Sequence, residues 1–223
     1  MKKSLLNIAT FGAASLFACL GCATPPADAP IGYIGPAIEG THSKVGTDPG
    51  AISKMGAYHL KPTGNDQIAA FSAGCFWGTE DIFRQVPGVV ATAVGYTGGH
   101  TDNPSYEDVC THTTGHAETV LIEFDPAKIT YKQLLRVFWE NHDPTTPNQQ
   151  GPDFGTNYRS AIWCFNKTQL DQAKQSFTEA QSKLKHKIVT EIQMKQPFWL
   201  AEGYHQQYDE KHGTHFCPIG HGS

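Results

Sequence analysis

The stretch Gln67-Ile-Ala-Ala-Phe-Ser-Ala-Gly-Cys-Phe-Trp-Gly-Thr-Glu-Asp-Ile-Phe-Arg-Gln85 contains two different periodicities. The apolar run from Ile68 to Phe71 is typical of a buried strand, and the pattern from Trp77 onward is helical. Small residues separate the two patterns, as expected of a turn. The stretch therefore predicts a strand that turns directly into a helix, with Cys75 at the turn.

Cys75 would lie where a cysteine is readily activated. A helix N-terminus presents unpaired backbone N–H groups and the positive end of the helix dipole, and both favour a thiolate. Gly74 and Gly78 permit a tight turn, while Phe76 and Trp77 place two aromatic rings beside the sulfur. We therefore predict that Cys75 is a nucleophile. The alternative is a structural cysteine packed behind the aromatic pair.

The composition is that of an ordinary globular protein. Of the 223 residues, 39% are hydrophobic and 17% are charged, and the formal net charge of −4 predicts no binding of nucleic acid.

The N-terminal residues 1–22 have the features of an export signal. Lys2 and Lys3 precede a short apolar segment that is too short for a permanent membrane span. The sequences ending at Cys19 and Cys22 both resemble the lipobox of bacterial lipoproteins, and the choice between them stays open. We expect an exported protein of a bacterium, either periplasmic or a lipoprotein whose only membrane contact is its lipid anchor. A secretory signal cut near Ala23 is the alternative.

Residues 23–65 are rich in proline and glycine and show no apolar period, which predicts a linker. Residues 66–223 are then one folded domain. Strands are expected at 68–71, 89–96, 119–124, 160–165 and 188–194. Helices are expected after Cys75, after a cap at Thr130 and after a cap at Asn166.

This order predicts an α+β fold of the α/β sandwich kind. We expect a mixed sheet with flanking helices in a split βαβ, ferredoxin-like arrangement. The Gly-rich chain after Pro197 would form a long C-terminal coil that wraps the domain.

Six segments together resemble peptide methionine sulfoxide reductases of the A type. They are Gly74-Cys-Phe-Trp-Gly78, Pro104-Ser-Tyr-Glu-Asp-Val-Cys110, Thr114-Gly-His-Ala-Glu118, Asn141-His-Asp-Pro-Thr145, Asp153-Phe-Gly-Thr-Asn-Tyr-Arg-Ser160 and Ala201-Glu-Gly-Tyr-His-Gln-Gln-Tyr208. Three positions, in two segments, depart from the family's usual pattern. Thr111-His112 replaces a small Ser-Gly pair, and Asn157 replaces a common Gln.

The resemblance implies a role for each matching residue. Cys75 would attack the sulfur of methionine sulfoxide, and Glu118 would protonate its oxygen. Tyr106 and Tyr158 would hydrogen-bond that oxygen, and Asp153 would orient water or the substrate. Phe76 and Trp77 would receive the methyl group. The A type implies the S epimer, in peptides and, as a further candidate, in free methionine sulfoxide.

The resemblance also implies a resolving cysteine and a reductant. Attack would leave Cys75 as a sulfenic acid, which a second thiol converts to a disulfide. We predict Cys217 for this role because its Gly-rich tail can approach Cys75, whereas Cys110 matches a non-catalytic position and Cys164 lies in an apolar strand. The electrons would come from a thioredoxin-like dithiol protein, with no bound cofactor or metal. We expect a monomer that repairs oxidised exported proteins.

Three rival interpretations remain open on the residues alone. Cys75 with His100, His112, His116 or His142 would form a papain-like acyl-transfer enzyme. A surface metal site would use His205, His212, His215, Cys217 and His221, although this spacing fits no standard zinc pattern. A lipoprotein adaptor without activity is the third.

Overall fold

The computed structural model describes residue 62 and residues 64–214. The predicted signal at 1–22, nearly all of the linker at 23–65, and Cys217 lie outside the described residues.

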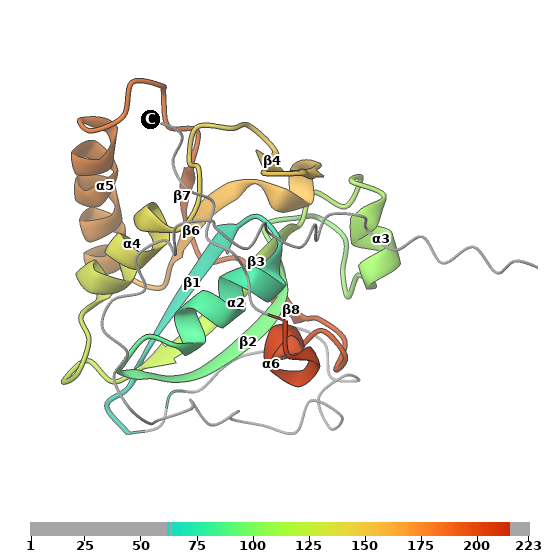
Figure 1. The fold of residues 1–223 in the computed structure, drawn as a ribbon, viewed down its shortest axis with the longest axis horizontal. Coiled ribbons are helices and arrows are strands. Elements are labelled where there is room, and N and C mark those ends of the chain that lie inside the picture. The colour runs from blue at the N-terminus through green and yellow to red at the C-terminus, as the bar shows by residue number, and fades with distance from the viewer. Residues whose placement is uncertain (1–61, 63, 215–223) are drawn as a thin grey trace, which may run out of the picture.

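The centre of the fold is a six-stranded mixed sheet in the order β7-β6-β1-β3-β2-β8 (Figure 1). Its strands are β1 (Gln67–Ala73), β2 (Val89–Thr97), β3 (Ala117–Phe124), β6 (Ser160–Cys164), β7 (Glu191–Met194) and β8 (Phe198–Leu200). Only the β6–β7 pair is parallel, and the other pairs are antiparallel. A two-stranded ribbon of β4 (Gln149–Gln150) and β5 (Asp153–Phe154) lies apart from this sheet.

The predicted split βαβ unit is present. Strands β1 and β2 are joined through the helix α2 (Phe76–Arg84), yet β3 lies between them and pairs antiparallel with both. Consequently β1 and β2 run in the same direction, and both of their C-terminal ends lie beside the N-terminal end of β3. The α+β fold class with a mixed sheet and flanking helices is therefore confirmed.

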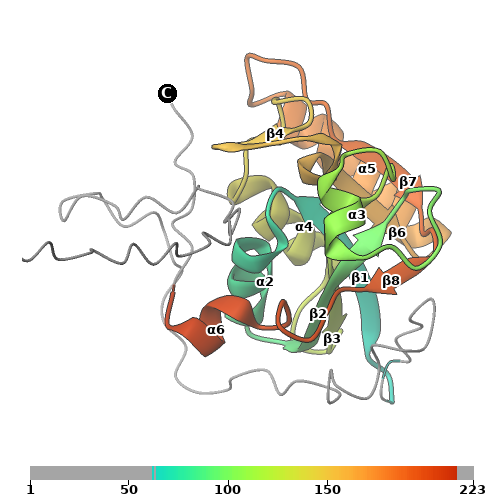
Figure 2. The same ribbon diagram turned by 90° about the vertical axis from the view of Figure 1, so that its right-hand side faces the viewer.

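Helices α2, α4 (Tyr131–Glu140) and α5 (Lys167–Gln181) pack on the sheet (Figures 1 and 2). Thr130 caps α4 with a full capping box and Asn166 caps α5, as the sequence predicts. The main core lies between these helices and the sheet, where Phe71 stacks on Phe83 and on Phe138. A smaller cluster around Trp163 and Phe198 lies on the opposite face of the sheet. No described helix is long and apolar enough to cross a bilayer.

Several short elements were not predicted. They are α3 (Tyr106–Cys110), the 3-10 helix η1 (Thr156–Tyr158), the β4–β5 ribbon, β8 and α6 (Tyr208–His212). The part of the predicted C-terminal coil that is described therefore begins with an edge strand and ends with a short helix that packs beside α2 (Figure 2). Elements of two to five residues are too short for a periodicity to emerge, so tertiary contacts decide them.

Candidate active site

The turn between β1 and α2 holds Cys75 at the N-cap of α2. Gly74 precedes it with a φ of +90°, and a Cβ on Gly74 would lie 2.6 Å from the Cβ of Gln150. Only glycine accepts both this backbone conformation and this close approach. The turn therefore sets Cys75, a half-buried residue, at the start of the helix.

The prediction that the helix N-terminus makes Cys75 a thiolate is wrong for the resting site, because other groups around Cys75 act more strongly on the pKa of its thiol. The backbone N–H groups of Trp77 and Gly78 do lower the pKa of the thiol. Burial raises this pKa more, and the carboxyl groups of Glu118 and Asp153 raise it further, so it lies well above the ordinary value. Cys75 is therefore a neutral thiol at neutral pH, and the helix N-terminus only reduces the cost of ionising it.

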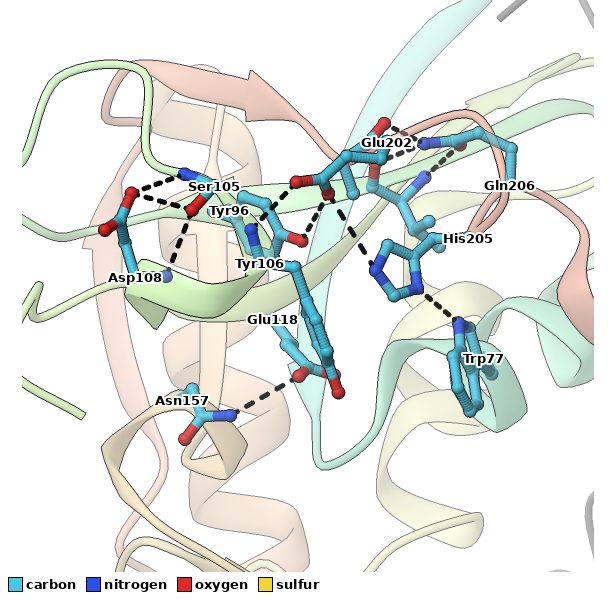
Figure 3. Close-up of polar contacts among 12 residues, drawn as sticks. Trp77, Tyr96, Ser105, Tyr106, Asp108, Glu118, Asn157, Glu202, His205 and Gln206 are labelled. Atoms are coloured by element: carbon cyan, nitrogen blue, oxygen red, sulfur yellow. Dashed lines mark hydrogen bonds and ion pairs between the residues drawn. The ribbon is translucent and has the colours of Figure 1, made fainter. Parts of the chain in front are cut away.

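The carboxyl group of Glu118 lies at the same helix end. Glu118 is 2% exposed, and its Oε2 accepts a hydrogen bond of 3.0 Å from the backbone N–H of Phe76. Its Oε1 accepts one of 3.3 Å from Nδ2 of Asn157 (Figure 3). Burial raises the pKa of Glu118 to about 8 despite these two donors, and the charge of Asp153 adds to the rise. Glu118 is thus a protonated carboxylic acid at neutral pH.

Three further predicted residues belong to elements near this pair. Asp153, at the start of β5, acts electrostatically on both Cys75 and Glu118, and burial raises its own pKa. Tyr158 is buried and follows Asn157 in η1, which packs against β3. Tyr106 begins α3, and Figure 3 shows its ring pointing toward the end of the site that holds Glu118 and Asn157.

Aromatic rings make an apolar wall on the side of Cys75 toward α6. His205 lies at its centre, with ring centroids 5.1 Å from Phe76, 5.5 Å from Trp77 and 4.5 Å from Tyr106. Its Nδ1 accepts a hydrogen bond of 3.0 Å from Nε1 of Trp77 (Figure 3). Burial lowers the pKa of His205 to about 4, so the imidazole is neutral and the wall carries no charge.

Glu202 fixes the position of Tyr106. Its Oε1 accepts the backbone N–H of Tyr106 at 2.8 Å, and its Oε2 accepts the hydroxyl of Tyr96 at 3.0 Å (Figure 3). Gln206 bonds both the N–H and the C=O of Val94 in β2. The segment after β8 is therefore attached to the sheet on one side and to the wall of the site on the other.

The segment around α6 packs against α2. The buried Glu80 accepts hydrogen bonds from the backbone and the side chain of Gln207, and Arg84 forms an ion pair with Glu210. Tyr208 stacks on Trp77 with the ring centroids 3.8 Å apart. These contacts run along α2 from Trp77, which lies near Cys75, to Arg84 at the other end of the helix.

Within the described residues, the structure gives no metal cluster, and three of the four histidines proposed for acyl transfer, His112 among them, bond other partners. No group of three or more potential metal ligands occurs there, and Nδ1 of His205 and of His212 are already bonded to Trp77 and to Tyr208. His215, Cys217 and His221 lie outside the described residues. Among the histidines proposed for an acyl-transfer enzyme, His116 bonds Thr101 and His142 bonds Phe138 and Ser160.

Sequence reasoning missed the residues that hold the site together. The sequence marks Asn157 only as a departure from a motif and predicts no catalytic role for His205 or Glu202. Each acts on a residue that is far away in the chain, as with His205 and Trp77, which are 128 residues apart. The only available signal was that Glu202 and His205 belong to a block shared with a family.

A thiol next to a protonated carboxyl group, with an apolar wall beside it, defines a thiol enzyme that attacks an electrophile with sulfur and protonates the atom it displaces. The family model that describes peptide methionine sulfoxide reductase matches residues 67–223. The chain belongs to this family, as a member of its A type. Its activity is therefore the thiol-dependent reduction of methionine sulfoxide.

The relatives agree along most of their length. The chain is 57% identical over 147 residues to the peptide methionine sulfoxide reductase MsrA of Methanosarcina acetivorans, covering 65% of this chain and 78% of the relative. It is 51% identical over 154 residues to peptide methionine sulfoxide reductase A2 of Arabidopsis thaliana, covering 69% of this chain and 71% of the relative.

The fold also matches a solved structure. Methionine sulfoxide reductase A of Corynebacterium diphtheriae superposes with a TM-score of 0.68 at 33% identity, covering 88% of this chain and 93% of that one.

Proposed function

We propose that the chain reduces the S epimer of methionine sulfoxide in exported proteins, through a sulfenic acid on Cys75 and a disulfide with Cys217. Free methionine sulfoxide is a further candidate substrate. The observation that carries this proposal is the buried Glu118, whose pKa of about 8 keeps it protonated beside Cys75 at neutral pH. A sulfoxide oxygen is a poor leaving group until it receives a proton, and Glu118 holds that proton.

In the first step the thiol of Cys75 and the carboxylic acid of Glu118 act together on the substrate. Sγ of Cys75 attacks the sulfoxide sulfur while Glu118 protonates the oxygen, and Glu118 recovers a proton from the thiol. The attack forms a bond between Sγ and the substrate sulfur, and the protonated oxygen leaves that sulfur as water. Water then attacks Sγ, the sulfur–sulfur bond breaks with its electron pair going to methionine, and Cys75 is left as a sulfenic acid. Proton exchange of this kind suits a resting thiol whose pKa is raised, because Cys75 need not be charged before substrate binds.

Tyr106, Tyr158 and Asp153 support this step. The phenol groups of Tyr106 and Tyr158 donate hydrogen bonds to the oxygen as its charge grows. Asp153 orients water or the substrate from β5. The apolar wall of Phe76 and Trp77 receives the methyl group, and a site that separates a methyl group from an oxygen accepts one epimer.

Resolution requires a second thiol. Cys217 attacks the sulfenic acid of Cys75, which forms a disulfide and releases water. Tyr208 stacks on Trp77, two residues after Cys75 in the chain, and Cys217 follows Tyr208 by nine residues in the sequence, which supports this choice of resolving thiol. A thioredoxin-like dithiol protein then reduces the disulfide by exchange, without a bound cofactor.

We expect one equivalent of the S epimer, added without external reductant, to give one equivalent of methionine and a protein lighter by two hydrogen atoms, with Cys75 joined to Cys217. Peptide mapping by mass spectrometry under non-reducing conditions checks the pair. Cys217→Ser should still form methionine once but keep Cys75 as a sulfenic acid that a dithiol protein cannot recycle.

Cys110→Ser and Cys164→Ser are the matched controls, and each should form the same disulfide as the unmodified protein. If one of them blocks recycling instead, Cys217 is not the resolving residue. Equal conversion of the R epimer would contradict the proposed pocket.

The domain division and the location are also proposed from sequence. Residues 1–22 are an export or lipoprotein signal, 23–65 are a linker, and 66–223 are the catalytic domain, which acts as a monomer outside the cytoplasm. We expect the protein in the membrane fraction of a bacterial host, and a Cys19→Ala, Cys22→Ala double variant in the soluble periplasmic fraction. Recovery of both proteins in the cytoplasm would contradict export.

A further inference from the structure

His112 is linked to Glu118 through one intermediate residue. Nδ1 of His112 lies 2.7 Å from Oδ1 of Asn157, and Nδ2 of the same carboxamide donates to Oε1 of Glu118 at 3.3 Å. Because Nδ2 is directed at Glu118, the oxygen is the atom that faces His112. Nδ1 of His112 must then carry the proton and donate it. The three side chains therefore form a continuous chain of hydrogen bonds that ends on the carboxyl group.

Local structure holds the imidazole ring in this position. His112 has a φ of +61°, and its carbonyl oxygen accepts a hydrogen bond of 3.3 Å from Oγ1 of Thr156. Gly155 leaves room for the ring, since a Cβ at that position would lie 2.3 Å from Cε1 of His112. Three features therefore place the ring of His112 over the start of η1: its own left-handed backbone, the absence of a side chain at Gly155, and the hydrogen bond from the hydroxyl of Thr156.

The partner of His112 is buried, whereas His112 is exposed. Asn157 is 1% exposed, so few alternative partners compete for its carboxamide. A carboxamide can turn over and exchange its oxygen for its amino group. With the amino group directed at Glu118 it stabilises the carboxylate, and with the oxygen directed there it stabilises the protonated acid. The donor on His112 selects the first of these orientations.

We propose that His112 is a positioning residue for sulfoxide reduction: it fixes the Asn157 carboxamide so that the carboxylate left on Glu118 after proton transfer is stabilised. This inference depends on the role proposed above for Glu118 as the acid. Other titratable groups that act on Glu118 include Cys75 at the start of α2, Tyr96 in β2 and Asp153 in β5, and the ring of Tyr106 points toward Glu118 from α3 (Figure 3). His112 acts on Glu118 through the Asn157 carboxamide, whose Nδ2 donates to Oε1.

The test is the variant His112→Gly in the full chain, because glycine accepts the positive φ at this position. We expect the pKa of Glu118 to rise by about half to one unit, read from the carboxyl carbon by NMR titration, since its carboxylate loses a fixed donor. The alkaline limb of kcat should shift by the same amount, and kcat at its plateau should fall about threefold to tenfold. Loss of a merely structural contact would not move the titration.

Three further variants make the test more specific. Asn157→Ala should produce the same shift, and adding His112→Gly to it should produce no more, because both changes remove one link of a single chain. His186→Ala removes an exposed histidine in the loop after α5 and should leave both titrations unchanged.

Two outcomes would overturn the inference, namely an unchanged pKa of Glu118 in His112→Gly and additive shifts in the double variant. A shift in the NMR titration without one in kcat would instead contradict the role of Glu118 as the acid. The effect of His112 on the pKa of Glu118 would still be established in that case, because NMR measures the titration of the carboxyl group directly.

Discussion

Replacement of Cys75 with serine is expected to abolish reduction of methionine sulfoxide. A serine hydroxyl is almost the same size as the thiol and keeps the turn after β1, but it is a far weaker nucleophile toward sulfur. We expect kcat to fall at least about 10³-fold, which corresponds to a barrier increase of about 4 kcal/mol. The measurement is formation of methionine from the S epimer with a small dithiol as reductant, which avoids any need for the natural electron donor.

The control for this prediction is Cys164→Ser. Cys164 is fully buried in β6, so this variant tests whether loss of a thiol as such affects the assay. Turnover at the unmodified rate in Cys75→Ser, with an unchanged melting temperature, would remove Cys75 from the mechanism.

Replacement of Glu118 with glutamine has the second largest expected effect. The amide has the same shape, yet it cannot give a proton to the sulfoxide oxygen, so we expect kcat to fall about 10²- to 10⁴-fold. The direction of the pH dependence follows from the raised pKa of about 8. Glu118 is protonated below that pH and active as an acid. Above it the proton is lost, and the rate of the unmodified protein should fall as pH rises through about 8.

Glu118→Gln should not show the fall in rate above about pH 8, because the group that titrates there has been removed. Glu123→Gln is the matched control, since Glu123 is also a buried glutamate of β3. It should keep the alkaline limb and most of the rate. A Glu118→Gln protein whose rate and pH profile equal those of the unmodified enzyme would show that another group supplies the proton.

Much of the architecture could be predicted because its signals are local. The strand and helix on either side of Cys75 follow from the periodicities of a single stretch, and Thr130 and Asn166 cap their helices as their side chains favour. The predicted split βαβ unit is also present, since alternating strands and helices allow few arrangements. By contrast, β8 was predicted as coil, because three residues show no period and only pairing with β2 makes them a strand.

The ionisation of the site could not be predicted in the same way. A helix N-terminus is visible in sequence, and its effect on Cys75 is real, but burial and the carboxyl groups of Glu118 and Asp153 outweigh it. These groups come from β3 and β5, so their influence depends on how strands pair.

By itself, the sequence determined the class of fold, the position of Cys75 on its turn and the family to which the chain belongs, because each depends on residues that are close together or on motifs read in order. Only the tertiary structure decided what Cys75 faces. The placement of β3 between β1 and β2 brings Glu118 to the backbone of Phe76 across 42 residues of chain. The tertiary structure also brings His112 into contact with Asn157. In the sequence these are two separate departures from the family pattern, because side chains interact through space and not along the chain.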